Sequence, residues 1–166
     1  MKKILIVLSI FTLISCENEK EISSVNPVNW EKRSIDLSQQ DSLIYGETYL
    51  SNYSQIYSYT EHSTHNLTST ISIRNTSIED TIYILSAKYF DTHGKLIRTY
   101  FEKPIYVSPM ETVAIVIDEV DMEGGTGANF LFDWAIKPTT TEPLFDGIQL
   151  STAGRISFTT EGKRIK

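Results

Sequence analysis

Cysteine is almost absent from this chain, which has one cysteine, Cys16, among 166 residues. A single cysteine excludes disulfide bonds within the chain, so the fold must be stabilised by the packing of its side chains. The sequence also has no internal repeat of fixed period and no low-complexity segment. Hydrophobic residues make up 40% of the chain and aromatic residues 11%, which is enough for a packed core and excludes a chain that is disordered throughout.

Basic residues are also scarce, since 15 lysines and arginines stand against 21 acidic residues. If an N-terminal signal ending at Ser15 is removed, Lys2 and Lys3 leave with it, so 13 basic residues remain against 21 acidic ones and the net charge becomes −8. A protein of this charge repels phosphate backbones and anionic headgroups. Nucleic acid is therefore excluded as a partner, and charge alone would not hold the protein on a membrane.

The sequence lacks an apolar run long enough to cross a bilayer. The run at positions 4–14 falls short of the roughly 20 residues that a membrane-spanning helix needs. Lys2 and Lys3 precede this run and the small residue Ser15 follows it, which together are typical of a secretory signal peptide. The segment Leu13-Ile14-Ser15-Cys16 resembles the bacterial lipobox, in which the protease cuts before the cysteine and the thiol carries the lipid.

We therefore predict a lipoprotein signal peptide at residues 1–15, cleaved between Ser15 and Cys16, and an acylated Cys16 with a flexible tether at residues 16–43. Two or more acyl chains would anchor the protein durably to a membrane outside the cytoplasm. The acidic segment 17–21 resembles signals that route lipoproteins to the cell surface, and it can also be read as a solvated tail. We expect the bacterial cell envelope, with the outer membrane or the cell surface favoured. Trp30 is expected either on the domain or at the lipid interface.

Residues 44–166 show the pattern of an all-β domain, with short alternating runs divided by turn residues. Phe130, Phe132, Trp134 and Ile136 fall on one side of such a run and Asp133 on the other. Similar runs are Leu67–Ile73, Val113–Ile117, Ile148–Leu150 and Ile156–Phe158. The run Ile82–Phe90 is apolar on both sides, which predicts a central strand.

Glycine, proline and aspartate mark the turns between these runs, and Asp91-Thr92-His93-Gly94 is typical of a hairpin. The pattern predicts an immunoglobulin-like β-sandwich of about seven to eight antiparallel strands. A small up-and-down β-barrel is the alternative.

Several segments in this order resemble a known bacterial family. They are Leu67-Thr68-Ser69-Thr70-Ile71-Ser72-Ile73-Arg74-Asn75-Thr76, Tyr89-Phe90-Asp91-Thr92-His93-Gly94-Lys95-Leu96-Ile97-Arg98, the glycine-rich segment Gly124–Phe130 with Trp134 after it, and Gly154-Arg155-Ile156-Ser157-Phe158. Together they resemble the family catalogued as domain of unknown function 3124, over roughly residues 45–165. The resemblance implies the domain boundaries and an exported setting, and it implies no activity.

The glycine-rich loop is the candidate ligand or interaction site, formed by Asp121, Glu123, Gly124, Gly125, Gly127 and Asn129. Consecutive amides in such a loop can bind an anion, but the loop is no Walker motif and its acidic residues would repel phosphate. A cation held by Asp121, Glu123 and loop carbonyls fits better, although the spacing matches no calcium loop. The other interpretation is a tight connection between strands, in which Asn129 hydrogen-bonds the loop.

The histidines are His62, His65 and His93, and the first two lie three residues apart in a segment rich in serine and threonine. In extended chain this spacing points the two rings apart, so we expect solvated loop histidines and assign no metal and no cofactor. Five tyrosines lie early in the domain (Tyr45, Tyr49, Tyr53, Tyr57 and Tyr59). In one strand the last four would share a face, as contact residues or as the rim of the core.

Recognisable catalytic motifs are missing, since the chain contains neither GxSxG nor HExxH. The sequence therefore predicts a lipid-anchored, non-catalytic binding or assembly module, attached to the membrane through Cys16, with an envelope protein or a glycan as its partner. The alternative is a small-ligand or metal-binding protein that uses the loop 121–129. A third hypothesis, from a different class, is a hydrolase acting on envelope polymers.

Overall fold

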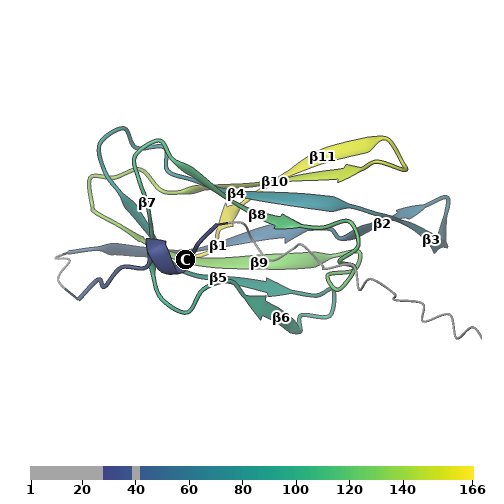
Figure 1. Ribbon diagram of the computed structural model, residues 1–166, viewed down its shortest axis with the longest axis horizontal. Helices are drawn as coiled ribbons and strands as arrows, with labels where there is room; N and C mark the ends of the chain where they lie inside the picture. The colour runs from purple at the N-terminus through teal and green to yellow at the C-terminus, as the bar shows by residue number, and fades with distance from the viewer. Residues whose placement is uncertain (1–27, 39–41) are drawn as a thin grey trace, which may run out of the picture.

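The computed structural model of this protein describes residues 28–38 and 42–166, and it shows two antiparallel sheets packed face to face (Figure 1). The predicted β-sandwich is confirmed. The barrel alternative is wrong, because neither sheet closes on itself.

The larger sheet has the order β12-β1-β9-β5-β6, with β7 also pairing with β5. Its strands are β1 (Ile44–Asn52), β5 (Ile82–Phe90), β6 (Leu96–Thr99), β7 (Ile105–Val107), β9 (Ala128–Ile136) and β12 (Lys163–Arg164). The smaller sheet has the order β11-β10-β4-β8. Its strands are β4 (Thr68–Arg74), β8 (Thr112–Ile117), β10 (Leu144–Ser151) and β11 (Ile156–Glu161).

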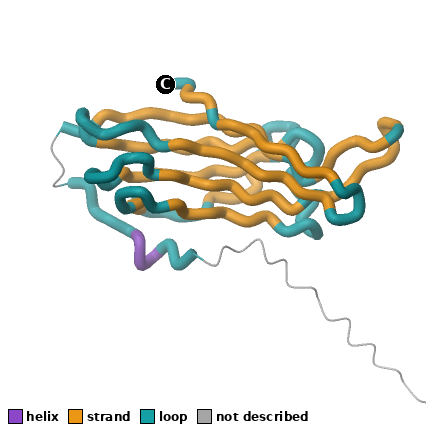
Figure 2. Tube along the Cα trace, turned by 90° about the horizontal axis from the view of Figure 1, so that it is seen from above, coloured by secondary structure: helices purple, strands orange, loops and turns teal. Residues whose placement is uncertain are grey.

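The third sheet is a hairpin of two strands, β2 (Gln55–Ser58) and β3 (Thr60–Asn66), which pair with each other. Figures 1 and 2 both show this hairpin projecting from one end of the sandwich. The described chain has twelve strands, more than the seven to eight expected. The hairpin and the two-residue β12 account for part of the excess, because neither carries the apolar alternation that marks a core strand.

Aromatic rings join the two layers of the core. Phe130 and Phe132 project inward from β9, and their rings are stacked with centroids 5.4 Å apart. Phe132 in turn stacks on Phe145 of β10 in the opposite sheet, at 4.4 Å. Tyr89 of β5 lies 4.7 Å from Phe130 at the other end of the row. The alternation of β9 thus places these rings in the core, as predicted, because successive side chains of a strand point to opposite faces.

Two other expectations about the strands have different outcomes. Strand β5 is flanked by β9 on one side and by β6 and β7 on the other, so its predicted central place is confirmed. Strand β10 contains Ile148 and Leu150 as expected, but each is 45% exposed. The inward positions of that strand are held by buried residues that include Phe145 and Gln149.

Residues 28–38, which we call the strap, lie on the sandwich although the tether was expected to run to residue 43. The Trp30 ring packs against the ring of the buried Phe101, with centroids 5.2 Å apart. A short 3-10 helix, η1 (Glu31–Arg33), follows, and its Arg33 Nη2 lies 2.6 Å from Glu111 Oε1. Of the two expected positions for Trp30, the structure thus shows the one on the domain. Within the described ranges, no helix combines the length and apolar character that crossing a bilayer requires.

Candidate functional site

The predicted glycine-rich loop connects β8 to β9 and lies at the end of the sandwich from which the hairpin projects (Figure 1). Two of its glycines are required by the local geometry. Gly125 has φ +67°, a left-handed conformation that other residues adopt at a cost. A side chain on the buried Gly124 would meet the Tyr89 hydroxyl at 1.9 Å, so only glycine fits there.

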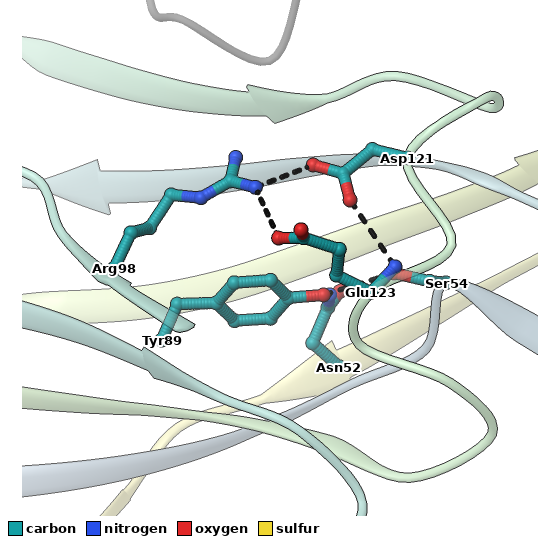
Figure 3. A network of polar contacts seen from close by, with 6 residues as sticks. All are labelled: Asn52, Ser54, Tyr89, Arg98, Asp121 and Glu123. Atoms are coloured by element: carbon teal, nitrogen blue, oxygen red, sulfur yellow. Dashed lines mark hydrogen bonds and ion pairs between the residues drawn. The ribbon is translucent and has the colours of Figure 1, made fainter. Parts of the chain in front are cut away.

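Both predicted acidic residues of the loop bind the same cation, which is an arginine of this chain (Figure 3). Asp121 Oδ2 accepts a hydrogen bond from Arg98 Nη2 at 2.8 Å, and the Asp121 side chain is completely buried. Glu123 Oε2 lies 3.1 Å from the same nitrogen but is 62% exposed. The other oxygen of Asp121 accepts a hydrogen bond from the backbone N–H of Glu123. Arg98 therefore occupies the place that a bound cation would take in the alternative interpretation of the loop.

The groups around Arg98 favour the charged form of its guanidinium. Burial alone would lower the pKa of Arg98, but Tyr100 and the two carboxylates favour the charged form and leave that pKa above its usual value. The resulting ion pair fixes β6, which contains Arg98, against the loop before β9.

A second polar network lies beneath the loop (Figure 3). The Tyr89 hydroxyl lies 2.9 Å from Ser54 Oγ and accepts a hydrogen bond from Asn52 Nδ2 at 3.4 Å. Asn52 Oδ1 accepts from Gln149 Nε2 of the opposite sheet at 3.1 Å. Asn52, Ser54 and Gln149 are fully buried, and burial raises the pKa of Tyr89. The phenol thus stays protonated, and these hydrogen bonds tie the two sheets together below the loop.

Side-chain hydrogen bonds also close the loop from outside. Thr92 Oγ1 donates to the carbonyl of Gly124 at 3.0 Å and accepts from the N–H of Gly127 at 3.1 Å. Asn129 Nδ2 donates to the carbonyls of Gly127 at 3.2 Å and Asp91 at 3.4 Å. The predicted hydrogen bonding of the loop by Asn129 is therefore confirmed. Tyr49 also donates to Asn129 Oδ1.

The loop holds the base of the hairpin. The carbonyl of Gly125 accepts hydrogen bonds from the N–H groups of Ser54, at 3.1 Å, and Gln55, at 3.0 Å. The N–H of Leu67 donates to the carbonyl of Ser54 at 2.9 Å and closes the base of the hairpin. The structure thus brings together all six loop residues that the sequence singled out, and it gives them the role of a brace for the hairpin.

The tyrosines do not share one face as expected, because the chain breaks its extended course between β1 and β2. Tyr45 and Tyr49 lie on β1, where they are 59% and 37% exposed. Tyr53 packs edge-on against Phe158. Tyr57 on β2 is 61% exposed, and Tyr59, between the hairpin strands, is completely exposed.

The histidines do not form a site. His62 and His65 lie in strand β3 and not in a loop as expected, and the ring of His62 is paired with neighbouring Glu61 at 3.4 Å. His93 lies in the turn between β5 and β6 and is exposed. In the part of the chain that the structure describes, no three histidine, cysteine, aspartate or glutamate side chains are placed to hold a metal ion together. Ser15 and Cys16 lie outside the described residues.

Sequence reasoning missed the residues that hold the loop, namely Arg98, Thr92 and Tyr89. No local signal marked Arg98, because a bulge interrupts the pairing of its short strand with β5, so its direction does not follow from parity with Leu96, which is 47% exposed. Thr92 belongs to an ordinary turn and Tyr89 to a strand that is apolar on both sides, so neither stands out in the sequence.

The fold and the site define an antiparallel β-sandwich with a braced, projecting hairpin and, among the described residues, no group of side chains placed to hold a metal ion. The model of the family described as "Protein of unknown function (DUF3124)" matches residues 45–165, so the chain belongs to this family. The resemblance seen in the sequence is thereby confirmed.

Two other comparisons add no function. No curated protein matches the chain. Among solved structures, a protein from Thermotoga maritima, titled "Crystal Structure of Thermotoga maritima 1070", is similar with 12% identity and a TM-score of 0.45, covering 71% of this chain and 92% of that one.

Proposed function

We propose that this protein is a lipid-anchored, non-catalytic binding module of the bacterial cell envelope, and that the hairpin β2–β3 is its contact element. The anchor is Cys16, the chain's one cysteine, at the position that a lipobox requires. The observation that carries the binding role is the exposed tip of the hairpin, held out from the sandwich by the loop 121–129.

Tyr59 at the tip supports this role in two ways. Its side chain is completely exposed, and its φ of +63° is a left-handed conformation. A non-glycine residue in this region costs about 1 kcal/mol or more, and such strain clusters at functional positions. Tyrosine is also enriched in protein contacts, because it offers a large, rigid, amphipathic ring at a small cost in conformational entropy.

The loop itself is a weaker candidate for ligand binding than its sequence indicated. Asp121 is buried against Arg98, and the carbonyls of Gly124, Gly125 and Gly127 accept hydrogen bonds within the protein. A metal ion would have to displace the guanidinium and break the brace. The geometry therefore favours the binding module over the small-ligand or metal-binding alternative.

The strap limits how far the domain stands from the membrane. Only residues 17–27 separate Cys16 from the strap, and at full extension they span at most about 36–40 Å. The domain would thus be held near the lipid surface, within reach of other membrane-anchored molecules.

The anchor is tested by mass spectrometry of the protein from native membranes. We expect a mature chain that begins at an acylated Cys16, and a Cys16→Ala variant that is neither cut there nor acylated. An unmodified amino terminus in the natural protein would refute the anchored setting.

The contact element is tested with a photo-crosslinking phenylalanine analogue in place of Tyr59, in the anchored protein in intact cells. The matched control carries the analogue at Tyr45, another exposed tyrosine (59%) that lies on β1. We expect a crosslinked protein with the analogue at position 59 and none at position 45. Absence of any adduct at position 59 would refute the binding role of the hairpin.

A further inference from the structure

We propose that the partner of the hairpin is a second copy of this chain, and that the two hairpins pair through the free edges of β3. This proposal rests on the proposed function, because it names the partner of the same contact element. The product is a four-stranded antiparallel sheet that bridges two sandwiches. Two copies related by a twofold axis would contribute the same edge, as closed protein dimers do.

The first reason is that the hairpin is incomplete as a sheet. Among the described residues, β2 and β3 pair only with each other, and Figure 2 shows them extending beyond the sandwich. The first five side chains of β3 are exposed, so no second layer covers either face there. A two-stranded hairpin is marginally stable in water, whereas three or more strands support one another. The two hairpin strands of another copy would supply the backbone hydrogen bonds that the free edge of β3 lacks.

The second reason is that the sequence of the hairpin lacks the residue types that protect sheet edges, although the β2–β3 ladder has one irregularity, between Tyr57 and Ser58. Residues 55–66 contain no proline, lysine or arginine, and their one acidic residue is Glu61. Natural sheets protect exposed edges with charged residues, lysine in particular, or with proline. This protein uses that protection on another edge strand, since β12 consists of Lys163 and Arg164.

The third reason is electrostatic and favours contact between hairpins over contact between sandwiches. A mature chain with the net charge of −8 derived above repels its own copies, but the hairpin contributes only the single carboxylate of Glu61 to that charge. A seven-residue strand such as β3 is about 23 Å long, whereas the Debye length at physiological ionic strength is about 8 Å. Pairing through the hairpins therefore keeps the two acidic bodies farther apart than their repulsion extends. Anchoring in one membrane further raises the local concentration of the copies.

The crosslinking analogue at position 59 distinguishes this inference from the proposed function. Cells that produce two differently tagged forms of the anchored protein should give an adduct of twice the protein's mass that carries both tags. An adduct with a different protein would overturn self-pairing and leave the binding role of the hairpin standing. No adduct would overturn both.

Single cysteines in β3 test the pairing itself, since Cys16, the natural cysteine, would be blocked by lipid. In an antiparallel pair of whole β3 strands, the middle residue Ser63 lies opposite its own copy, at a Cβ separation of about 4.5–5.5 Å. We expect Ser63→Cys to form a disulfide-linked dimer on mild oxidation in membranes, with His62→Cys and Thr64→Cys reporting a pairing whose twofold axis lies one residue away and whose register is therefore shifted by two. Ser157→Cys, on an exposed position of β11, is the matched control and should stay monomeric.

A charged side chain at position 63 should weaken the pairing that the cysteine at that position is expected to trap. Ser63→Lys places two like charges directly across the pair, which should weaken association up to about fivefold, while Ser157→Lys should have no effect. Because Ser63 is exposed, neither substitution at this position should disturb folding. Failure of all three β3 cysteines to crosslink above the Ser157→Cys control would overturn the proposal.

Discussion

Replacing Gly124 by alanine tests whether the loop braces the hairpin. The new Cβ would lie 1.9 Å from the Tyr89 hydroxyl, 2.7 Å from Ser54 Oγ and 2.8 Å from the Cβ of Ala128. Tyr89 cannot retreat, because it is fully buried and its ring stacks on Phe130. The loop must therefore move, and with it the Gly125 carbonyl that holds the base of the hairpin.

The size of the effect follows from the packing. Forcing an extra methyl group into a well-packed interior costs about 1–3 kcal/mol, and we expect Gly124→Ala to lie near the upper end because three neighbours are too close. Gly94→Ala is the control for a glycine replaced without a clash: Gly94, unlike Gly124, has a positive φ, +79°, and nothing lies within 4 Å of an added Cβ. The control should cost only about 1 kcal/mol, the penalty for a left-handed alanine.

Urea unfolding of the two variants gives the free energies, and hydrogen exchange of residues 55–66 reports on the hairpin. Exchange there should be faster in Gly124→Ala than in Gly94→Ala. Tyr89→Phe removes the oxygen that clashes, so Gly124→Ala combined with Tyr89→Phe should lose about 1–2 kcal/mol less than the sum of the single changes. Additive losses, or a Gly124→Ala variant as stable as the control, would refute the brace.

The remaining predictions concern the two ion pairs that fix the loop and the strap. Asp121→Asn should lower the free energy of unfolding by about 2–3 kcal/mol, because it leaves Arg98 without its buried charged partner. Glu123→Gln, at an exposed carboxylate, should lower it by less than about 1 kcal/mol. Equal losses of the two variants in urea unfolding would contradict this assignment. The pKa of Glu111 lies below its ordinary value of 4.5, chiefly because its carboxylate accepts a hydrogen bond from Arg33. The pair therefore stabilises the strap fully above pH 4.5, by about 1 kcal/mol for two half-buried groups, and this contribution disappears as the pH falls through the lowered pKa. Limited proteolysis should show the strap released in acid, and Glu111→Gln should remove that pH dependence; a variant with the natural pH profile would show that another group controls release.

The pattern of apolar and polar residues along the chain determined the architecture. Alternation of apolar and polar residues with a period of two marks one face of β9 for the core, and Phe130, Phe132 and Trp134 are buried there. The two-sided run that became β5 could be placed in the middle of a sheet for the same reason, because only an inner strand buries both faces. These properties are local, so a single sequence is enough to predict them. The export signal is equally local, and it stays a prediction on which the anchored setting depends.

The tertiary structure alone decided what the glycine-rich loop does and which element is free to bind. Asp121 and Arg98 are 23 residues apart, and Ser54 and Tyr89 are 35 apart, so no periodicity connects them before the sheets assemble. The same acidic residues that indicated a cation site are bound by an arginine that the fold brings to them. The hairpin could not be recognised for a related reason: its strands bury no core face, so they lack the alternation by which a sequence reveals its strands.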